Sequence, residues 1–66
     1  MQNKNFFFTV ICPTYNSENY IKKNFYSLLS QKNQDFEVIY IDDGSTDDTV
    51  KIIKKLIKNY SNFKIF

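Results

Sequence analysis

Residues 36–48 read FEVIYIDDGSTDD, and this abrupt change from apolar to acidic residues decides the fold prediction. The apolar, β-branched part predicts a strand over 36–41. The acidic part predicts a sharp turn, in which Gly44 supplies the backbone freedom. Ser45, followed three residues later by Asp48, is typical of a capping box at the start of a helix.

A helical pattern follows this turn. Apolar residues recur at the spacing of one helical face, and lysines take the opposite side, which we expect to be solvated. The apolar positions are Ile53, Leu56, Ile57 and Tyr60, and the lysines are Lys51, Lys54, Lys55 and Lys58. Residues 63–66 then predict a further strand.

The same order of elements precedes residue 36. Residues 6–12, FFFTVIC, form a nearly continuous apolar run, which predicts a strand buried on both faces and ended by Pro13. Residues 13–16 are expected to form a turn. Ser17 is the expected N-cap of a helix that ends near Gln31. The buried stripe of that helix would be Ile21, Phe25, Leu28 and Leu29.

Strand, helix, strand, helix, strand is the pattern of half a doubly wound α/β fold. Right-handed crossovers make the three strands parallel. We expect residues 1–66 to be a single partial domain.

Composition excludes several classes of function. The chain has 66 residues, no His and one cysteine, Cys12, which we expect to be a small core residue. A disulfide scaffold, a zinc site and His-based catalysis are therefore excluded within this chain. Nine Lys without Arg argue against sequence-specific nucleic-acid binding. No run of 18 apolar residues is present, and the short run 6–12 lacks the cleavage site of a signal peptide, so we expect a cytosolic location.

Parallel sheets bind ligands at the carboxyl edge of their strands. Two loops, 13–18 and 42–48, should meet there. Tyr15 can cover a base or ribose, or pack within the protein. Asp43 can accept a hydrogen bond from a ribose hydroxyl or a pyrimidine N3–H, or cap the neighbouring backbone. Adjacent carboxylates at 42 and 43 should diverge, which argues against a Mg²⁺ site.

The sequence lacks the residues that two other phosphate-binding motifs require. The segment 13–18, PTYNSE, has no glycine, so neither a dinucleotide fingerprint nor a P-loop is present.

Three segments together resemble one family. They are VICPTYN at 10–16, LLSQ at 28–31 and FEVIYIDDGSTD at 36–47. In identity, order and spacing they resemble the amino-terminal part of the family 2 inverting glycosyltransferases. The resemblance covers about residues 6–66. It implies an α/β fold, with a parallel β-α-β-α-β half of the three-layer, Rossmann-like GT-A fold of nucleotide-diphospho-sugar transferases.

The resemblance also implies a nucleotide-binding role for this chain. Pro13 and Tyr15 would line the base, Asp43 would accept the base N3–H, Glu18 would lie near the nucleotide and Asp42 would support the loop. The complete set of implied nucleotide-binding residues is Pro13, Thr14, Tyr15, Glu18, Asp42, Asp43 and Ser45. No catalytic or metal-binding residue is expected here, although the family implies Mg²⁺ or Mn²⁺ for the complete enzyme.

The resulting hypothesis is an amino-terminal fragment of a glycosyltransferase of polysaccharide biosynthesis. It would bind a nucleotide-sugar donor, a UDP-sugar, for inverting transfer to a carbohydrate or lipid-linked acceptor. The complete enzyme is expected in the cytoplasm, at the inner face of the membrane. The 66-residue chain alone is expected to be inactive.

Other interpretations stay open from sequence. They are a non-catalytic nucleotide-binding module, an inactive truncated product, and a dehydrogenase relative that lacks its glycines. An exposed third strand also predicts self-association.

Overall fold

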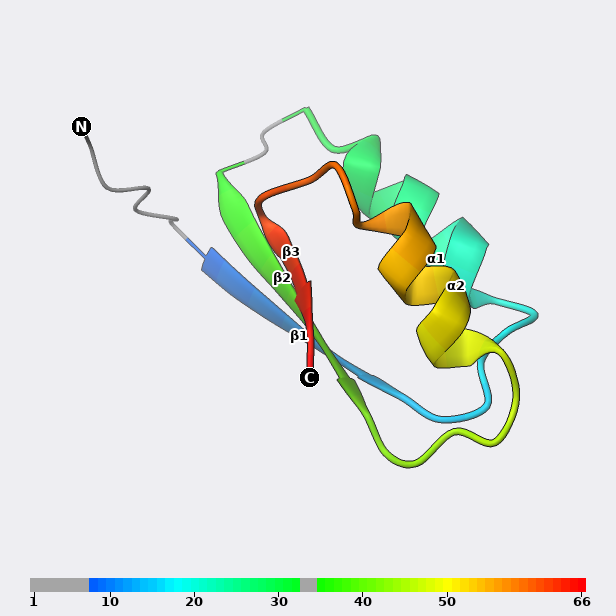
Figure 1. Ribbon diagram of the computed structural model, residues 1–66. Coiled ribbons are helices and arrows are strands. Elements are labelled where there is room, and N and C mark those ends of the chain that lie inside the picture. The colour runs from blue at the N-terminus through cyan, green and yellow to red at the C-terminus, as the bar shows by residue number, and fades with distance from the viewer. Residues whose placement is uncertain (1–7, 33–34) are drawn as a thin grey trace.

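The computed structural model describes residues 8–32 and 35–66. Three strands and two helices alternate along the chain (Figure 1). They are β1 (Phe8–Thr14), α1 (Ile21–Leu29), β2 (Phe36–Asp42), α2 (Thr49–Leu56) and β3 (Phe63–Ile65). The predicted order of elements is confirmed. No helix within the described part of the chain is long and apolar enough to span a bilayer.

The strands form one parallel sheet in the order β1-β2-β3. The pairing of β1 with β2 runs in continuous register from Phe8 opposite Phe36 to Thr14 opposite Asp42. β3 pairs with the other side of β2, where Phe63 lies opposite Val38. Because β2 is central, it fixes the position of both other strands.

Both helices cover the same face of the sheet, where α1 and α2 also contact each other (Figure 1). Two right-handed crossovers that proceed in the same direction across a sheet place their helices on one side. The chain therefore forms two layers of the three-layer fold, namely the sheet and one helix layer.

The core lies between these layers. Its buried side chains are Ile21, Phe25, Phe36, Val38, Tyr40, Ile53 and Phe63. Phe25 and Phe63 pack with their ring centroids 5.0 Å apart. The buried Tyr40 hydroxyl donates to Asn24 Oδ1 at 2.8 Å, which satisfies the one polar group that this ring brings into the core. Cys12 packs half-buried against the same cluster, in agreement with its predicted core role.

The first strand differs from its prediction. Residues 6 and 7 lie outside the described residues, and β1 continues through Pro13 to Thr14. Burial on both faces is wrong, since Ile11 is 51% exposed on the face that carries no helix. Pro13 is tolerated because β1 pairs only with β2, so a missing N–H costs little on this edge strand.

The helix starts also differ from the predicted caps. α1 begins at Ile21, because Ser17 forms a separate turn in which its carbonyl accepts from the backbone N–H of Tyr20 and Ile21. α2 begins at Thr49 without a side-chain cap from Asp48, so the predicted capping box does not form. Both loops bond to each other instead.

Further boundaries also shift. α1 ends at Leu29, two residues before the predicted Gln31, and β2 includes Asp42. α2 ends at Leu56, so Ile57 and Tyr60, which were predicted on its apolar stripe, lie beyond the helix.

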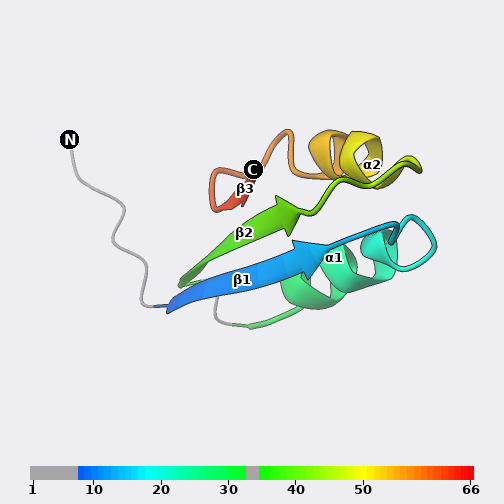
Figure 2. The same ribbon diagram turned by 90° about the horizontal axis from the view of Figure 1, so that it is seen from below.

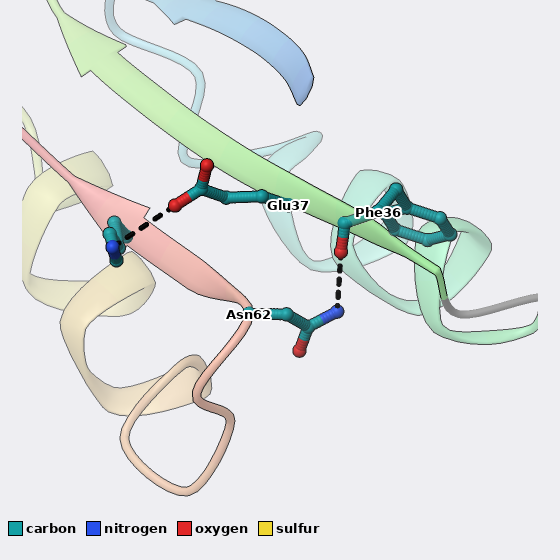
Figure 3. Close-up of polar contacts among 4 residues, drawn as sticks. Phe36, Glu37 and Asn62 are labelled. Atoms are coloured by element: carbon teal, nitrogen blue, oxygen red, sulfur yellow. Dashed lines mark hydrogen bonds and ion pairs between the residues drawn. The ribbon is translucent and has the colours of Figure 1, made fainter. Parts of the chain in front are cut away.

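Polar contacts fasten β3 to β2 (Figure 3). Asn62 Nδ2 donates to the Phe36 carbonyl at 3.2 Å, and Lys64 Nζ lies 3.0 Å from Glu37 Oε2. The Lys64 side chain is half exposed, so this ion pair contributes little on its own. Backbone bonds provide most of the attachment, including Val38 N–H to the Asn62 carbonyl at 2.8 Å.

The core assignment predicts different costs for two isoleucines, Ile53 of α2, which is buried between helix and sheet, and Ile11 of β1, which lies on the open face of the sheet. Ile53→Ala is expected to lower the free energy of unfolding by about 2–5 kcal/mol, because Ile53 is fully buried. Ile11→Ala, the matched control on the open face, should cost less than about 1 kcal/mol. Urea unfolding followed by far-UV circular dichroism measures both, and equal losses would contradict the assignment.

Candidate functional site

The two loops expected to form a site meet at the carboxyl edge of the sheet. Thr14 and Asp42 are paired at the ends of β1 and β2, and Asp43 N–H then donates to the Thr14 carbonyl at 2.9 Å. Figure 2 shows both loops leaving the sheet on the same side of the molecule. Tyr15 and Asp43, the next residues along each chain segment, therefore lie at one rim. We call residues 13–18 and 42–49 the rim.

Asp42 holds the start of the second loop. Its carboxylate accepts from the Thr14 hydroxyl at 2.8 Å, from the Ser45 backbone N–H at 2.8 Å and from the Ser45 hydroxyl. The Ser45 hydroxyl is the main cause that lowers the pKa of Asp42, followed by the Ser45 backbone N–H. These bonds match the loop-supporting role expected of Asp42, and they place Thr14 and Ser45 in the same network.

Asn16 joins the two loops directly. Its Oδ1 accepts from the backbone N–H of Thr46 at 2.8 Å and of Asp47 at 3.3 Å, and its own N–H donates to Ser45 Oγ at 2.9 Å. Its φ of 46° is left-handed, a conformation that asparagine tolerates better than most residues. From sequence, Asn16 was predicted only as part of a turn. Its position beside Tyr15 and its residue type were the available signals.

A second set of bonds lies next to Asn16. Ser17 N–H donates to Thr49 Oγ1 at 2.7 Å, and Asp47 accepts from the Thr49 N–H at 2.9 Å and from its hydroxyl. Glu18 N–H donates to Asp47 Oδ2 at 3.3 Å, while Asp48 N–H donates to Glu18 Oε1 at 2.9 Å. Asp47 and Thr49 were absent from the predicted site, and Glu18 is partly engaged by the loop itself.

Asp47 has its pKa lowered despite an opposing effect. Desolvation is the largest single influence and raises the pKa of Asp47, but the bonds from Thr49 and from the Glu18 backbone together outweigh it. Because Asp42 and Asp47 both titrate below the ordinary value of 3.8, the stability they contribute is complete above that pH. It is lost as the pH falls through the lowered values.

Three predicted residues remain open to solvent at the rim. Pro13 and Asp43 are exposed, and the Tyr15 side chain is 58% exposed. Within residues 8–32 and 35–66, the Asp43 carboxylate has no hydrogen-bonding partner. Gly44, with φ of 81°, lets the chain turn directly after Asp43. The rim thus presents an aromatic ring and a carboxylate from neighbouring strand ends.

A small cavity of about 150 Å³ lies behind the rim, between β1 and the start of α1. It shares Pro13, Thr14 and Ser17 with the rim and also contacts Cys12 and Tyr40. Burial raises the pKa of the Cys12 thiol and of the Tyr40 hydroxyl. Both groups therefore stay protonated near neutral pH, which makes them poor nucleophiles and poor metal ligands.

The described residues do not fit the divalent metal that the family resemblance implies. Among them, no three Asp, Glu, Cys or His side chains come together as a metal-binding group. Asp42 is occupied by Thr14 and Ser45, and the adjacent Asp43 is the only other carboxylate at that strand end. We derive no metal-dependent step from this chain.

The sequence profile of the glycosyl transferase family 2 matches residues 9–66. The chain belongs to this family.

Individual relatives agree with the family match. An uncharacterized glycosyltransferase of Haemophilus influenzae is 41% identical over 58 residues, which cover 88% of this chain and 23% of that protein. The poly(ribitol-phosphate) β-N-acetylglucosaminyltransferase TarS of Staphylococcus aureus is 47% identical over 60 residues, covering 88% of this chain and 10% of TarS. The chain thus spans less than a quarter of either relative.

Solved structures show the same fold. The crystal structure of S. aureus TarS 1–349 in complex with UDP superimposes with a TM-score of 0.67 at 43% identity. The match covers 88% of this chain and 18% of the TarS chain. The predicted GT-A type of α/β fold is confirmed.

The side chain and the left-handed backbone of Asn16 should contribute separately to stability, and two substitutions distinguish these contributions. Asn16→Gly removes the amide oxygen but tolerates a φ of 46°, so it should cost about 1 kcal/mol of unfolding free energy. Asn16→Ala should cost at least about 1 kcal/mol more, because alanine is strained in the left-handed region. Urea unfolding curves measure the difference. Alanine as stable as glycine would contradict the left-handed geometry.

Proposed function

We propose that this chain binds the nucleotide of an activated sugar donor, a UDP-sugar, for inverting transfer of the sugar to an acceptor hydroxyl. One observation carries the proposal. Asp43 stands exposed beside the Tyr15 segment, whereas the neighbouring Asp42 and Asp47 are both occupied by bonds within the rim. Asp43 is thus the carboxylate that remains available to a ligand at the strand ends.

Each rim residue has a role in this proposal. The exposed Tyr15 ring stacks on the base, and Pro13 lines it. The Asp43 carboxylate accepts the uracil N3–H. Thr14, Asp42 and Ser45 position the Asp43 backbone through their mutual hydrogen bonds. Glu18 lies on the nucleotide side of the rim, and its bond to Asp48 orients it. The solved relative with bound UDP supports the choice of nucleotide.

The transfer step needs groups beyond the rim. In an inverting transfer, a general base removes the proton of the acceptor hydroxyl, whose oxygen then attacks the anomeric carbon as the nucleoside diphosphate departs. The rim residues bind and orient the donor in this scheme. We propose that the base, the acceptor pocket and the ligands of a divalent metal, Mg²⁺ or Mn²⁺, lie outside the described residues. The TarS relative, named for transfer to a poly(ribitol-phosphate) polymer, supports a role in polymer glycosylation.

The role of Asp43 is tested by comparing two pyrimidine nucleotides. UDP carries an N3–H and CDP does not, so the wild-type chain should bind UDP more tightly. Asp43→Ala should weaken UDP binding about tenfold or more and abolish the preference over CDP. Asp35→Ala, which removes the same charge at the amino end of β2, should leave the preference intact. NMR titration of amide shifts suits the weak affinity expected of an open half-site.

The outcomes of this comparison are distinct. A UDP preference that survives in Asp43→Ala would remove Asp43 from the base site. Equal binding of UDP and CDP by the wild-type chain would contradict the proposal that the rim reads uracil.

Catalysis by the isolated chain is not expected. Asp48 is the last acidic residue of the sequence and no His is present, so no side chain after residue 48 can act as a carboxylate or imidazole base. A non-catalytic nucleotide-binding module would share this property. We expect no sugar transfer and no UDP release when the purified chain is incubated with UDP-sugars, as measured by a coupled UDP assay. Steady UDP release would refute this expectation.

A further inference from the structure

The outer surface of the helix layer carries a concentration of positive charge. Neither α1 nor α2 contains an acidic residue, and the two helices with the turn after α2 display six exposed lysines. We call this surface the lysine face; its lysines are Lys22, Lys23, Lys51, Lys54, Lys55 and Lys58. Within the described part of the chain, none of these lysines forms an ion pair, since the ion pair found there joins Lys64 to Glu37.

The acidic residues gather elsewhere. Five of the seven acids lie in the two rim loops, and the other two are Asp35 and Glu37 near the start of β2. The formal net charge is only +2, but the positive and negative side chains lie on different parts of the surface. The rim is acidic and the lysine face is basic.

A groove between the helices gives the lysine face a mixed character. Its volume is about 340 Å³, and it is lined by Lys22 and Tyr26 from α1 and by Ile52, Lys55 and Leu56 from α2. Tyr26 is 56% exposed, and Ile52 and Leu56 are half-buried. The lysine ammonium groups of the groove thus lie beside a tyrosine ring and two aliphatic side chains.

We propose that the lysine face docks on an anionic phospholipid bilayer. Lysine ammonium groups are attracted by the negative surface potential of such a bilayer. Their aliphatic stems can lie along apolar surface while the charges reach the head groups. Tyrosine favours the boundary between water and hydrocarbon, where its ring and hydroxyl are both accommodated. The lysine face combines all three features on two adjacent helices.

The composition of the face favours a bilayer over a nucleic acid. The chain has no Arg, the residue best suited to bidentate phosphate contacts. The groove also contains Ile52 and Leu56 between its two lysines, and these apolar side chains offer no hydrogen bond to a sugar–phosphate backbone. Diffuse attraction to lipid head groups needs neither feature.

Docking in this way would orient the rim. The helices cover a face of the sheet, whereas the two loops leave from its carboxyl edge (Figures 1 and 2). A bilayer against the helix layer would therefore leave the rim open at the side, along the membrane surface. This orientation follows from the fold and does not depend on the identity of the rim ligand.

Vesicle binding of two charge-matched variants tests the proposal. The pair Lys22→Gln and Lys55→Gln removes the two lysines of the groove, while Lys32→Gln with Lys64→Gln removes two lysines outside the lysine face. Both double variants reduce the formal net charge from +2 to zero. The probe is co-sedimentation with phosphatidylcholine vesicles that contain phosphatidylglycerol, at low ionic strength. Far-UV circular dichroism checks that both variants remain folded.

The groove variant should lose roughly thirtyfold in vesicle partitioning, at about fivefold per lysine, and the control variant less than about threefold. Binding should require phosphatidylglycerol and weaken as salt is added. Equal losses in the two variants, equal binding to pure phosphatidylcholine, or no vesicle binding by the wild-type chain would each overturn the proposal. Tighter binding to single-stranded DNA than to the vesicles, lost in the groove variant, would assign the face to nucleic acid instead.

Discussion

The pairing of the carboxyl ends of β1 and β2 is the constraint on which the rest of the site depends. Register places Thr14 opposite Asp42, and the next backbone bond joins Asp43 N–H to the Thr14 carbonyl. From that point both chain segments must leave the sheet at the same edge, although Thr14 and Asp42 are 28 positions apart in sequence. A slip of one residue would turn the Asp42 carboxylate to the other face of the sheet and separate it from the Thr14 hydroxyl and Ser45.

The polar network of the rim converts this backbone pairing into a defined surface. Loops of this length are ordinarily mobile, because few buried contacts hold them. Here Asn16, Asp42 and Asp47 accept the backbone N–H groups of the opposite or the same loop, so both loops are held from several directions. Ordering these loops before a ligand arrives lowers the entropy cost of binding. This order occupies the carboxylates of Asp42 and Asp47, whereas the exposed Asp43 carboxylate at the end of β2 stays available to a ligand.

The fold and the meeting of the two loops could be predicted from the sequence, because both follow from periodicity and chain topology. Apolar spacing identified the helices through Phe25 and Ile53, and parallel pairing required both loops to share an edge. The hydrogen bonds of the rim could not be predicted where the bonded residues are distant in sequence. Ser45 satisfies the rule for a local helix cap, yet its hydroxyl bonds Asp42 and Asn16 instead. No local rule identifies Asn16, since its three acceptor contacts lie about 30 residues away.

The division of charge between rim and helix layer has a physical basis in the same fold. Both helices begin at the carboxyl edge of the sheet, so their positive dipole ends point toward the rim. Acidic loops are favoured there, as Glu18 and Asp47 illustrate, and α2 carries Lys54 and Lys55 in its last turn, where the dipole is negative. Helix electrostatics thus accounts for acids at the rim and for lysines at the far end of α2. It does not account for Lys22, which lies in the first turn of α1, at the positive end of the dipole. A lysine in that position is unfavourable for the helix itself, and this is why the groove it shares with Lys55 points to a partner outside the chain.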